Sequence, residues 1–292
     1  MKTILIPTDF SPNADHAALY AMELGKNMKA SLKLCNAVMV PASASMSGQV
    51  AWPLMDLGTL RADANRQLKQ VSEKLKKHIK DTGASREEYP PVEVLAEVGT
   101  VPEVLNMLAE KGEVNLVVMG TSGVGGLNRF FLGSTSRDLI NNGSFPILLI
   151  PPGTDFKPLK RIAFATDFSD GDMELIHSLS HFARPFNAEI LIVHITPDDF
   201  DPEIHQKKVD SFLNEVTCKV HYHKVYYRHV KDMGIDEGLT WLTDHVDIDM
   251  LAMVHRRHPF IKRLFEGSHT QKMAVHVKLP LLVFPPETHT VL

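Results

Sequence analysis

The segment from Asn115 to Ser136 has the sequence NLVVMGTSGVGGLNRFFLGSTS. It begins with a short apolar run, Leu116–Met119, which predicts a strand buried on both faces of a sheet. Four glycines follow within seven residues, and Ser134 or Thr135 is expected to cap the next helix. A strand end, a glycine loop and a helix N-terminus together predict an anion site, most often for phosphate. A flexible glycine turn without a ligand is the alternative, since a lone glycine motif is weak evidence.

The composition is typical of a soluble globular protein. The chain has 292 residues, of which 44% are hydrophobic and 23% charged, and its formal net charge is -4. This charge gives no general reason to expect nucleic-acid or membrane binding, and no apolar stretch approaches the roughly 18 residues of a membrane span. Both cysteines, Cys35 and Cys218, lie in apolar-looking segments, so we expect buried free thiols and a cytoplasmic protein.

The chain contains an internal repeat. The sequence ILIPTDFS at Ile4–Ser11 returns as IAFATDFS at Ile162–Ser169, at an offset of 158 residues. Toward the end of each half the offset falls to 134 residues, where the Gly-Ser pair at 133–134 matches the pair at 267–268. We therefore expect two domains of one fold, residues 1–152 and 157–292. Because the segment between them is short and rich in turn residues, the two copies should contact each other.

Each half alternates apolar strands with helical segments, which predicts parallel βαβ units in a doubly wound sheet. In the first half we expect strands at Thr3–Pro7, Ser31–Val40, Val92–Val98, Val114–Met119 and Pro146–Ile150. A long amphipathic helix is expected from Ala62 to about His78, after a loop at Pro41–Leu60. Ligands bind such sheets at the carboxyl ends of the strands, where the strand order reverses. There Asp9 could accept hydrogen bonds from a base or ribose, and Asp9 or Ser11 could cap the next helix, so Asp9 could have both roles.

The pattern Gly120-x2-Gly123-x9-Gly133-Ser134 resembles the nucleotide-binding motif of the universal stress protein family. Three further elements resemble that family: PTDFS from residue 7, VVMG ending at residue 120, and PILLIP ending at residue 151. The resemblance covers both halves. It implies an α/β protein of two tandem flavodoxin-like, Rossmann-like domains, each with a five-stranded parallel sheet of order 3-2-1-4-5 flanked by helices.

The resemblance also implies that ATP, with or without Mg²⁺, binds in the first half. The nucleotide-binding residues that it implies are Pro7, Thr8, Asp9, Ala37, Met119, Gly120, Gly123, Gly133, Ser134 and Thr135. Among these, Asp9 would contact the adenine or ribose, and the backbone around Ala37 would flank the adenine. Met119 and Gly120 would line the ribose side. The phosphates would lie against the later glycines and the two hydroxyl groups.

The second half departs from this motif. Val254 stands where the first half has Gly120, and Arg257 where it has Gly123. Because β-branched valine resists a positive φ, the tight turn should not form in the same way, and we expect this site to be degenerate for ATP. A second anion site could instead form from Arg256, Arg257, Gly267 and Ser268. A patch for nucleic acid or an acidic partner, or a plain solvated loop, are the other interpretations of this basic segment.

Histidine is concentrated in the second half, but no metal site is expected. His221 and His223 alternate as on one strand face, and His255 and His258 have the spacing of a chelating pair. No third or fourth ligand follows at a recognisable spacing. A structural metal is therefore the weaker interpretation of these residues.

The leading hypothesis for function is a stress-response regulator that binds ATP in its first domain and signals through its shape or through an unidentified protein partner. The chain lacks a Walker-type lysine and a convincing base or nucleophile, which argues against a dedicated enzyme. Slow ATPase activity, or autophosphorylation of Ser134, Thr135 or Ser136, stays open. The alternative is an adaptor that binds a different small ligand or a protein and has a vestigial nucleotide loop. The two copies can pair through their fifth strands as a pseudo-dimer, and further homodimerisation is open.

Overall fold

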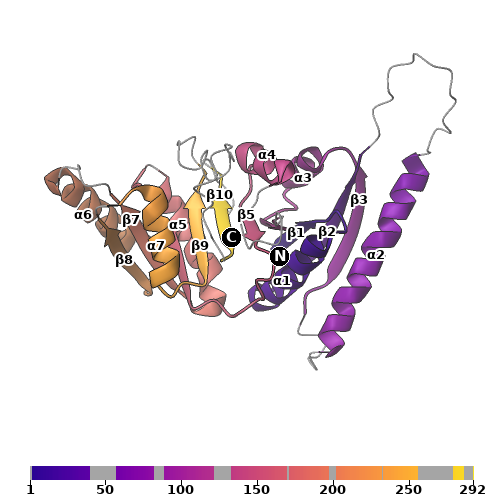
Figure 1. Cartoon of the computed structure of the whole chain (residues 1–292), viewed down its shortest axis with the longest axis horizontal. Helices are drawn as coiled ribbons and strands as arrows, with labels where there is room; N and C mark the ends of the chain where they lie inside the picture. Colours follow the sequence, from indigo (N-terminus) through magenta and orange to yellow (C-terminus); the bar gives the residue numbers. More distant parts are fainter. Residues whose placement is uncertain are drawn as a thin grey trace, which may run out of the picture.

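The computed structural model describes residues 2–39, 57–81, 89–121, 133–169, 171–196, 202–231, 233–255, 279–285 and 292. In this part of the chain the strands form one ten-stranded sheet of order β3-β2-β1-β4-β5-β10-β9-β6-β7-β8 (Figure 1). The first half supplies β1 (Thr3–Pro7), β2 (Ser31–Val38), β3 (Val92–Val98), β4 (Leu116–Gly120) and β5 (Ile147–Ile150). The second half supplies β6 (Arg161–Ala165), β7 (Glu189–Ile195), β8 (Val225–Val230), β9 (Met250–Val254) and β10 (Leu281–Phe284).

Within each half all strand pairs are parallel, and each half has the predicted order 3-2-1-4-5. The halves join where β5 pairs antiparallel with β10, and Leu148 lies opposite Leu282 in that pair. The predicted fold class is therefore confirmed. The pairing through the two fifth strands, expected from the repeat, is also observed, and it makes one continuous sheet from two copies.

Helices cover both faces of this sheet. On one face lie α1 (Pro12–Met28), α2 (Leu57–Asp81), α5 (Asp172–Ala183) and α6 (Pro202–Lys219). On the other face lie α3 (Val101–Glu110), α4 (Ser134–Asn142) and α7 (Ile235–His245). Neighbouring residues of β1 alternate between the faces, so that Ile4 and Ile6 join the first core while Leu5 joins the second. Each core continues from the first half into the second, which explains why the strands are apolar on both sides.

The first helix is capped as expected, whereas the start of the second differs from the sequence-based expectation. Ser11 is the N-cap of α1, because its Oγ accepts a hydrogen bond from Ala14 N at 3.2 Å. The second helix begins at Leu57 and not near Ala62, so residues 57–60 were wrongly predicted to be loop. This first turn is tied to the sheet, since Arg61 Nε donates to Ala96 O of β3 at 2.9 Å. The rest of the predicted loop lies outside the described residues.

The segment that joins the halves packs into the fold. The ring of Phe156 meets Tyr20 of α1 edge-on, with 5.1 Å between ring centroids. Thr154 O lies 2.9 Å from His16 Nε2, also on α1. Burial of Tyr20, together with the nearby charge of Asp249 from the second half, raises the pKa of the tyrosine. The predicted contact between the two copies is therefore observed here as well as at the strands.

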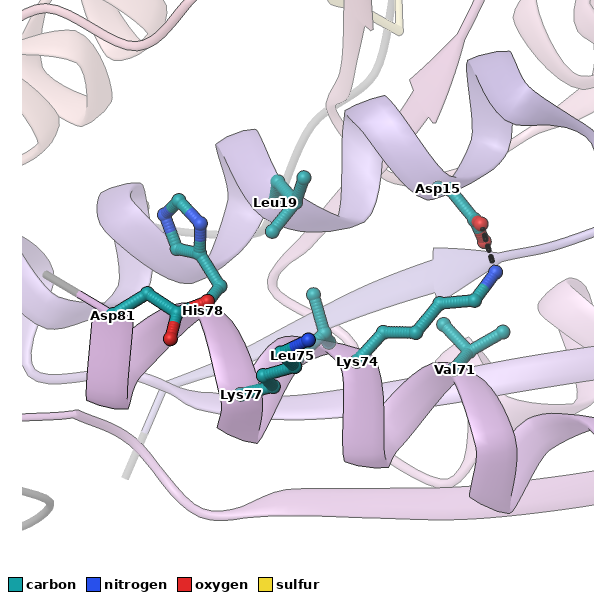
Figure 2. Close-up of a pocket in the computed structure, with 8 residues that line it drawn as sticks. All are labelled: Asp15, Leu19, Val71, Lys74, Leu75, Lys77, His78 and Asp81. Atoms are coloured by element: carbon teal, nitrogen blue, oxygen red, sulfur yellow. Dashed lines mark hydrogen bonds and ion pairs between the residues drawn. The ribbon is translucent and has the colours of Figure 1, made fainter.

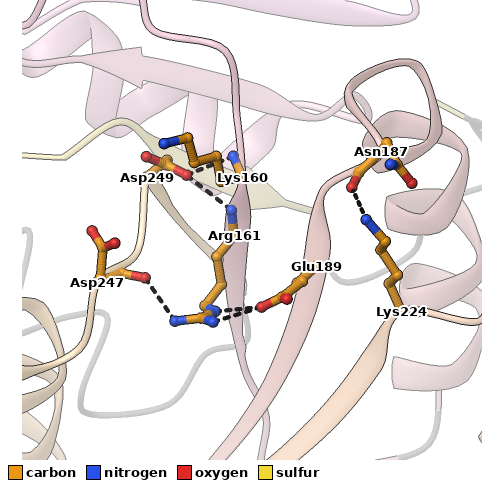
Figure 3. Close-up of polar contacts among 7 residues, drawn as sticks. All are labelled: Lys160, Arg161, Asn187, Glu189, Lys224, Asp247 and Asp249. Carbon is orange, nitrogen blue, oxygen red and sulfur yellow. Dashed lines mark hydrogen bonds and ion pairs between the residues drawn. The ribbon is translucent and has the colours of Figure 1, made fainter.

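A polar network ties the strands of the second half at their amino ends (Figure 3). Arg161 of β6 donates from Nε to Glu189 of β7 at 2.7 Å, and from Nη1 to the backbone oxygen of Asp247 at 3.2 Å. Asp249 Oδ2 accepts from the backbone N–H groups of Lys160 and Arg161, at 2.6 and 2.8 Å. These bonds fix β9 beside β6 at the start of both strands.

The expected positions of three side chains were wrong, those of Cys218, His221 and His223. Cys35 is buried, and burial raises the pKa of its thiol to about 12, but Cys218 is exposed on α6. The apolar neighbours of Cys218 occupy other faces of the helix, so local sequence misplaced this side chain. His221 and His223 precede β8, which begins at Val225, and both are exposed. They do not lie on a strand face.

Candidate functional site

A tight turn follows β1 and presents Asp9 at the carboxyl end of the sheet. Thr8 Oγ1 accepts a hydrogen bond from Phe10 N, and Asp9 Oδ1 accepts one from Ser11 N, both at 3.0 Å. The two bonds hold Phe10 at φ 64°, in the left-handed region that phenylalanine rarely adopts. The carboxylate of Asp9 is exposed, and only its Oδ1 has a partner among the described residues.

Strand β2 holds this turn in place from the side. Thr8 N donates to Cys35 O at 2.9 Å, while Asn36 Nδ2 donates to Thr8 O at 2.7 Å. Pro7 lies in register with Cys35, so Ala37 lies beyond the end of β1 and beside the turn. Ala37 is partly buried on the face covered by α3 and α4. The turn and the end of β2 thus lie on one side of the crevice that a doubly wound sheet forms where its strand order reverses, here between β1 and β4.

Strand β4 forms the other side with Met119 and Gly120. A Cβ on Gly120 would lie 2.5 Å from the backbone oxygen of Asn13, in the first turn of α1. Its φ is not positive, unlike that of Gly99, Gly112, Gly153 and Gly171. The expectation that a tight turn with φ > 0 requires this glycine was therefore wrong. Glycine is needed here because the backbone of α1 approaches the end of β4.

The N-terminus of α4 completes the described part of the crevice. Gly133 is the N-cap and has no side-chain cap, and Arg137 N donates to Gly133 O at 3.1 Å. Ser134 and Thr135 are therefore the first helical residues, and the prediction that one of them is the cap was wrong. Both are exposed, whereas Ser136 is buried. No side chain among the described residues caps the first N–H groups of α4, and such groups at a helix N-terminus can bind an anion.

Several predicted site residues lie outside the described residues. They are Gly123, Arg256, Arg257, Gly267 and Ser268, together with His258. The structure brings together the remaining predicted residues at the ends of β1, β2 and β4 and at the start of α4. Sequence reasoning did not single out Asn13 and Asn36. The available signals were the position of Asn13 just after the TDFS repeat and the match of Asn36 with His194 at the same offset.

The second half repeats the turn after its first strand. Thr166 Oγ1 accepts from Phe168 N at 2.9 Å, Asp167 Oδ1 accepts from Ser169 N at 3.1 Å, and φ of Phe168 is 58°. His194 takes the place of Asn36, with its Nδ1 2.7 Å from Thr166 O. The left-handed phenylalanine is therefore a property of the repeat and not a mark of a ligand site.

The crevices of the two halves differ in side-chain volume at matching positions. Val254 ends β9 where Gly120 ends β4, and Ile195 ends β7 where the first half has Ala37. Ile195 has a glycine opposite. A Cβ on Gly238 of α7, where α3 has Val104, would lie 2.6 Å from Ile195 Cγ2.

A matching change occurs at the start of the first helix. Gly171 is the N-cap of α5 and stands at the position of Asn13 in the repeat. In the repeat, α5 therefore starts two positions later than α1, whose Asn13 backbone crowds Gly120. The second crevice thus contains larger side chains where the first contains Ala37 and Gly120. His255 follows Val254, and burial lowers the pKa of its imidazole.

A separate groove of about 300 Å³ lies between α1 and α2 (Figure 2). Its apolar floor includes Leu19 and Leu75, and its rim carries the ion pair between Asp15 Oδ2 and Lys74 Nζ at 2.6 Å. None of the predicted nucleotide-binding residues lines it. Among the described residues, no three His, Cys, Asp or Glu side chains are grouped so that they could hold a metal ion. In the described part of the chain, no helix is both long and apolar enough to span a membrane.

The fold and the crevice define a class, the tandem doubly wound α/β proteins with a site at the carboxyl ends of their strands. The sequence model of the universal stress protein family matches residues 1–151 and 158–285. The chain therefore belongs to the universal stress protein family, with two family domains in tandem.

The relatives agree with this assignment. A universal stress protein of Synechocystis sp. is 22% identical over 302 residues, which cover 97% of this chain and 100% of that protein. One from Methanocaldococcus jannaschii is 30% identical over 151 residues, or 51% of this chain and 81% of that protein. The crystal structure of a universal stress protein from Archaeoglobus fulgidus covers 98% of both chains, with a TM-score of 0.69 at 15% identity. This likeness shows the shared fold.

Proposed function

We propose that this protein is a stress-response regulator that binds ATP in its first half and not in its second. The observation that carries the proposal is the contrast between the two crevices of one chain. The first is lined by Ala37 and Gly120 and has an uncapped helix N-terminus, while the second has Ile195 and Val254 at the matching positions. The family of the chain supports the role in stress, since its relatives are named universal stress proteins.

In this proposal each side of the crevice holds one part of the nucleotide. The free oxygen of Asp9 accepts hydrogen bonds from the ribose or adenine, beside the backbone of Pro7 and Thr8. The end of β2 at Ala37 flanks the base, and Met119 with Gly120 lines the ribose side. The phosphates lie at Gly133, Ser134 and Thr135, because the N-terminus of a helix attracts anions. Mg²⁺ would be held mainly by the phosphates and water.

Calorimetry with matched carboxamide variants tests the proposal. Asp9→Asn keeps the oxygen that accepts from Ser11 N, so the turn survives, but it removes the negative charge. Asp167→Asn makes the same change at the matching turn of the second half. We expect one molecule of ATP per chain, with weaker binding to Asp9→Asn and unchanged binding to Asp167→Asn. Two sites per chain, or equal effects of the two substitutions, would reject the assignment to the first half.

An adaptor with a vestigial nucleotide loop is the second candidate. It predicts that saturating ATP with Mg²⁺ leaves the melting temperature unchanged, whereas a ligand at one hundred times its Kd stabilises by about 2.7 kcal/mol. Slow hydrolysis or autophosphorylation would use the exposed hydroxyls of Ser134 and Thr135. Phosphate release or phosphoserine that persists in Asp9→Ala would assign that activity to a contaminant and not to this crevice.

A further inference from the structure

The two outer edges of the sheet are protected differently. At one edge α2 packs along β3, and Arg61 Nε bonds the outward-facing oxygen of Ala96 (Figure 1). At the other edge a groove of about 650 Å³ lies between α6 and β8. An edge strand offers unpaired backbone groups to other chains, and natural proteins usually cover it. The β8 edge therefore differs from the edge at the matching strand of the first half.

The outward-facing backbone groups of β8 belong to alternate residues. Ile190 N donates to Lys224 O at 2.8 Å and Thr196 N donates to Val230 O at 3.0 Å, which sets the ladder with β7. By this alternation Val225 and Tyr227 direct their N–H and C=O groups away from the sheet. No residue that the structure describes bonds to the outward backbone groups of Val225 or Tyr227. A further strand could pair with them.

The groove beside these groups is largely apolar. Its lining includes Leu213, Val216, Val220, Val225 and Tyr227. The hydroxyl of Tyr227 is buried, and it has no hydrogen-bond partner in the described part of the chain. Burial raises the pKa of Tyr227 to about 12, so this hydroxyl stays a donor at pH 7. An unpartnered buried hydroxyl costs stability unless a ligand satisfies it.

Three cations lie around β8 without an acidic partner in the described part of the chain. The guanidinium of Arg228 lies 5.3 Å from the ring centre of Trp241, and that of Arg184 lies 5.8 Å from the ring centre of Tyr222. Lys224 Nζ donates to Asn187 O at 2.9 Å (Figure 3). None of these three cations forms an ion pair with a carboxylate among the described residues. Positive charge here, in a chain of net charge -4, favours an acidic occupant.

We propose that the β8 edge binds an acidic peptide segment of another protein, which adds in extended form as a further strand beside β8. Alternate side chains of such a strand enter the groove toward Tyr227, and the others lie on the face of Tyr226 and Arg228, where carboxylates are favoured. A second copy of β8 would place like charges together. The alternating backbone groups match a peptide and not a nucleic acid. The proposal is independent of nucleotide binding in the first half.

Fluorescence anisotropy with the full chain tests this edge. The probe is a short, end-blocked, labelled peptide in which Glu alternates with Val, and the same peptide with Lys in place of Glu is its control. We expect micromolar binding of the acidic peptide, about tenfold or more weaker for the lysine peptide, and weakening with added salt. Arg228→Gln should bind several-fold more weakly and with a shallower salt dependence.

Proline substitution isolates the backbone contribution. Val225→Pro removes an outward N–H and leaves the ladder with β7 intact, because proline is tolerated where the N–H faces away from the sheet. Val225→Ala keeps the N–H, so it measures the effect of losing the valine side chain alone. Val94→Pro makes the matched change at the β3 edge, where Val94 also faces outward. Circular dichroism and melting curves monitor the fold of each variant.

We expect Val225→Pro to bind the acidic peptide about tenfold or more weakly than Val225→Ala and Val94→Pro do. Equal binding by Val225→Pro and Val225→Ala would overturn the strand addition. Binding weaker than about 1 mM, or equal binding of the lysine peptide, would overturn the acidic partner. Tighter binding of single-stranded oligothymidylate would assign the surface to nucleic acid. If light scattering shows that the chain associates with itself and that Val225→Pro blocks this association, the β8 edge binds a second copy of this chain.

Discussion

Replacing Gly133 with aspartate tests whether the N-terminus of α4 holds the phosphates of ATP. Gly133 is the N-cap of α4 without a side-chain cap, and a Cβ built there meets none of the described atoms within 4 Å. Aspartate suits this position, because it is a preferred N-cap whose carboxylate accepts hydrogen bonds from the N–H groups of the first turn. Gly133→Asp therefore fills the proposed phosphate-binding groups with the protein's own carboxylate and does not crowd the fold.

The free energy of ATP binding should fall by several kcal/mol in this variant. Each charge-assisted hydrogen bond to a phosphate is worth roughly 1.5–3 kcal/mol, so the loss of two costs roughly 3–6 kcal/mol. Since about 1.4 kcal/mol is a factor of ten, the affinity should fall at least about a hundredfold. The free energy of unfolding without ATP should rise by only a few tenths of a kcal/mol, about the difference between glycine and aspartate at an N-cap.

Isothermal titration calorimetry measures the affinity, and urea denaturation without ATP measures the free energy of unfolding. Gly234 provides the matched control, because it is the N-cap of α7 in the second half and also lacks a side-chain cap. Gly234→Asp should leave ATP binding unchanged. If Gly133→Asp folds normally and binds ATP within about threefold of the unchanged chain, the phosphates do not lie at α4 and the reasoning is refuted.

Three further predictions concern stability and packing. Gly120→Ala should lower the free energy of unfolding in urea by about 1–3 kcal/mol, because its Cβ would lie 2.5 Å from a backbone oxygen of α1; an unchanged value would contradict the crowding. Hydrogen bonds from Thr100 lower the pKa of Glu103, so the capping box stabilises α3 above the usual glutamate pKa and loses this effect as the pH falls through the lowered value. Thr100→Ala should raise that pKa in a carbon NMR titration of the carboxyl group. Ile195→Ala and Gly238→Val should each lower the free energy of unfolding. The double variant recreates the alanine–valine pair of the first half, so the changes in unfolding free energy should depart from additivity by about 0.5–3 kcal/mol.

Much of the fold follows from the sequence, because strands buried on both faces appear as short apolar runs. The runs at Thr3–Pro7 and Val92–Val98 coincide with β1 and β3, and the repeat predicts the same strand order in both halves. Each such strand is a short, continuous segment, so a local stretch of sequence is enough to predict it. The side-chain direction of Cys218 was mispredicted, because it depends on which side of α6 faces the sheet.

The packing of the crevice could not be predicted, because it joins residues that are distant in the chain. A glycine run suggests a positive φ, whereas Gly120 is crowded by Asn13 from a helix more than a hundred residues earlier. The paired exchange of Ala37 and Val104 for Ile195 and Gly238 becomes visible only when the ends of the strands and helices are placed side by side. In both pairs, Gly120 with Asn13 and Ile195 with Gly238, the two residues are too far apart in the chain for a local stretch of sequence to reveal the contact.

Strand β5 gives the second half a structural role that does not depend on a ligand. All four residues of β5 are buried, and its outer side pairs with β10. Without the second half, β5 would be an apolar edge strand and thus a template for another chain. We therefore expect a fragment of residues 1–152 to form homodimers through β5, with light scattering giving twice the fragment mass. A folded fragment that stays monomeric at high concentration would show that the first half protects this edge without its repeat.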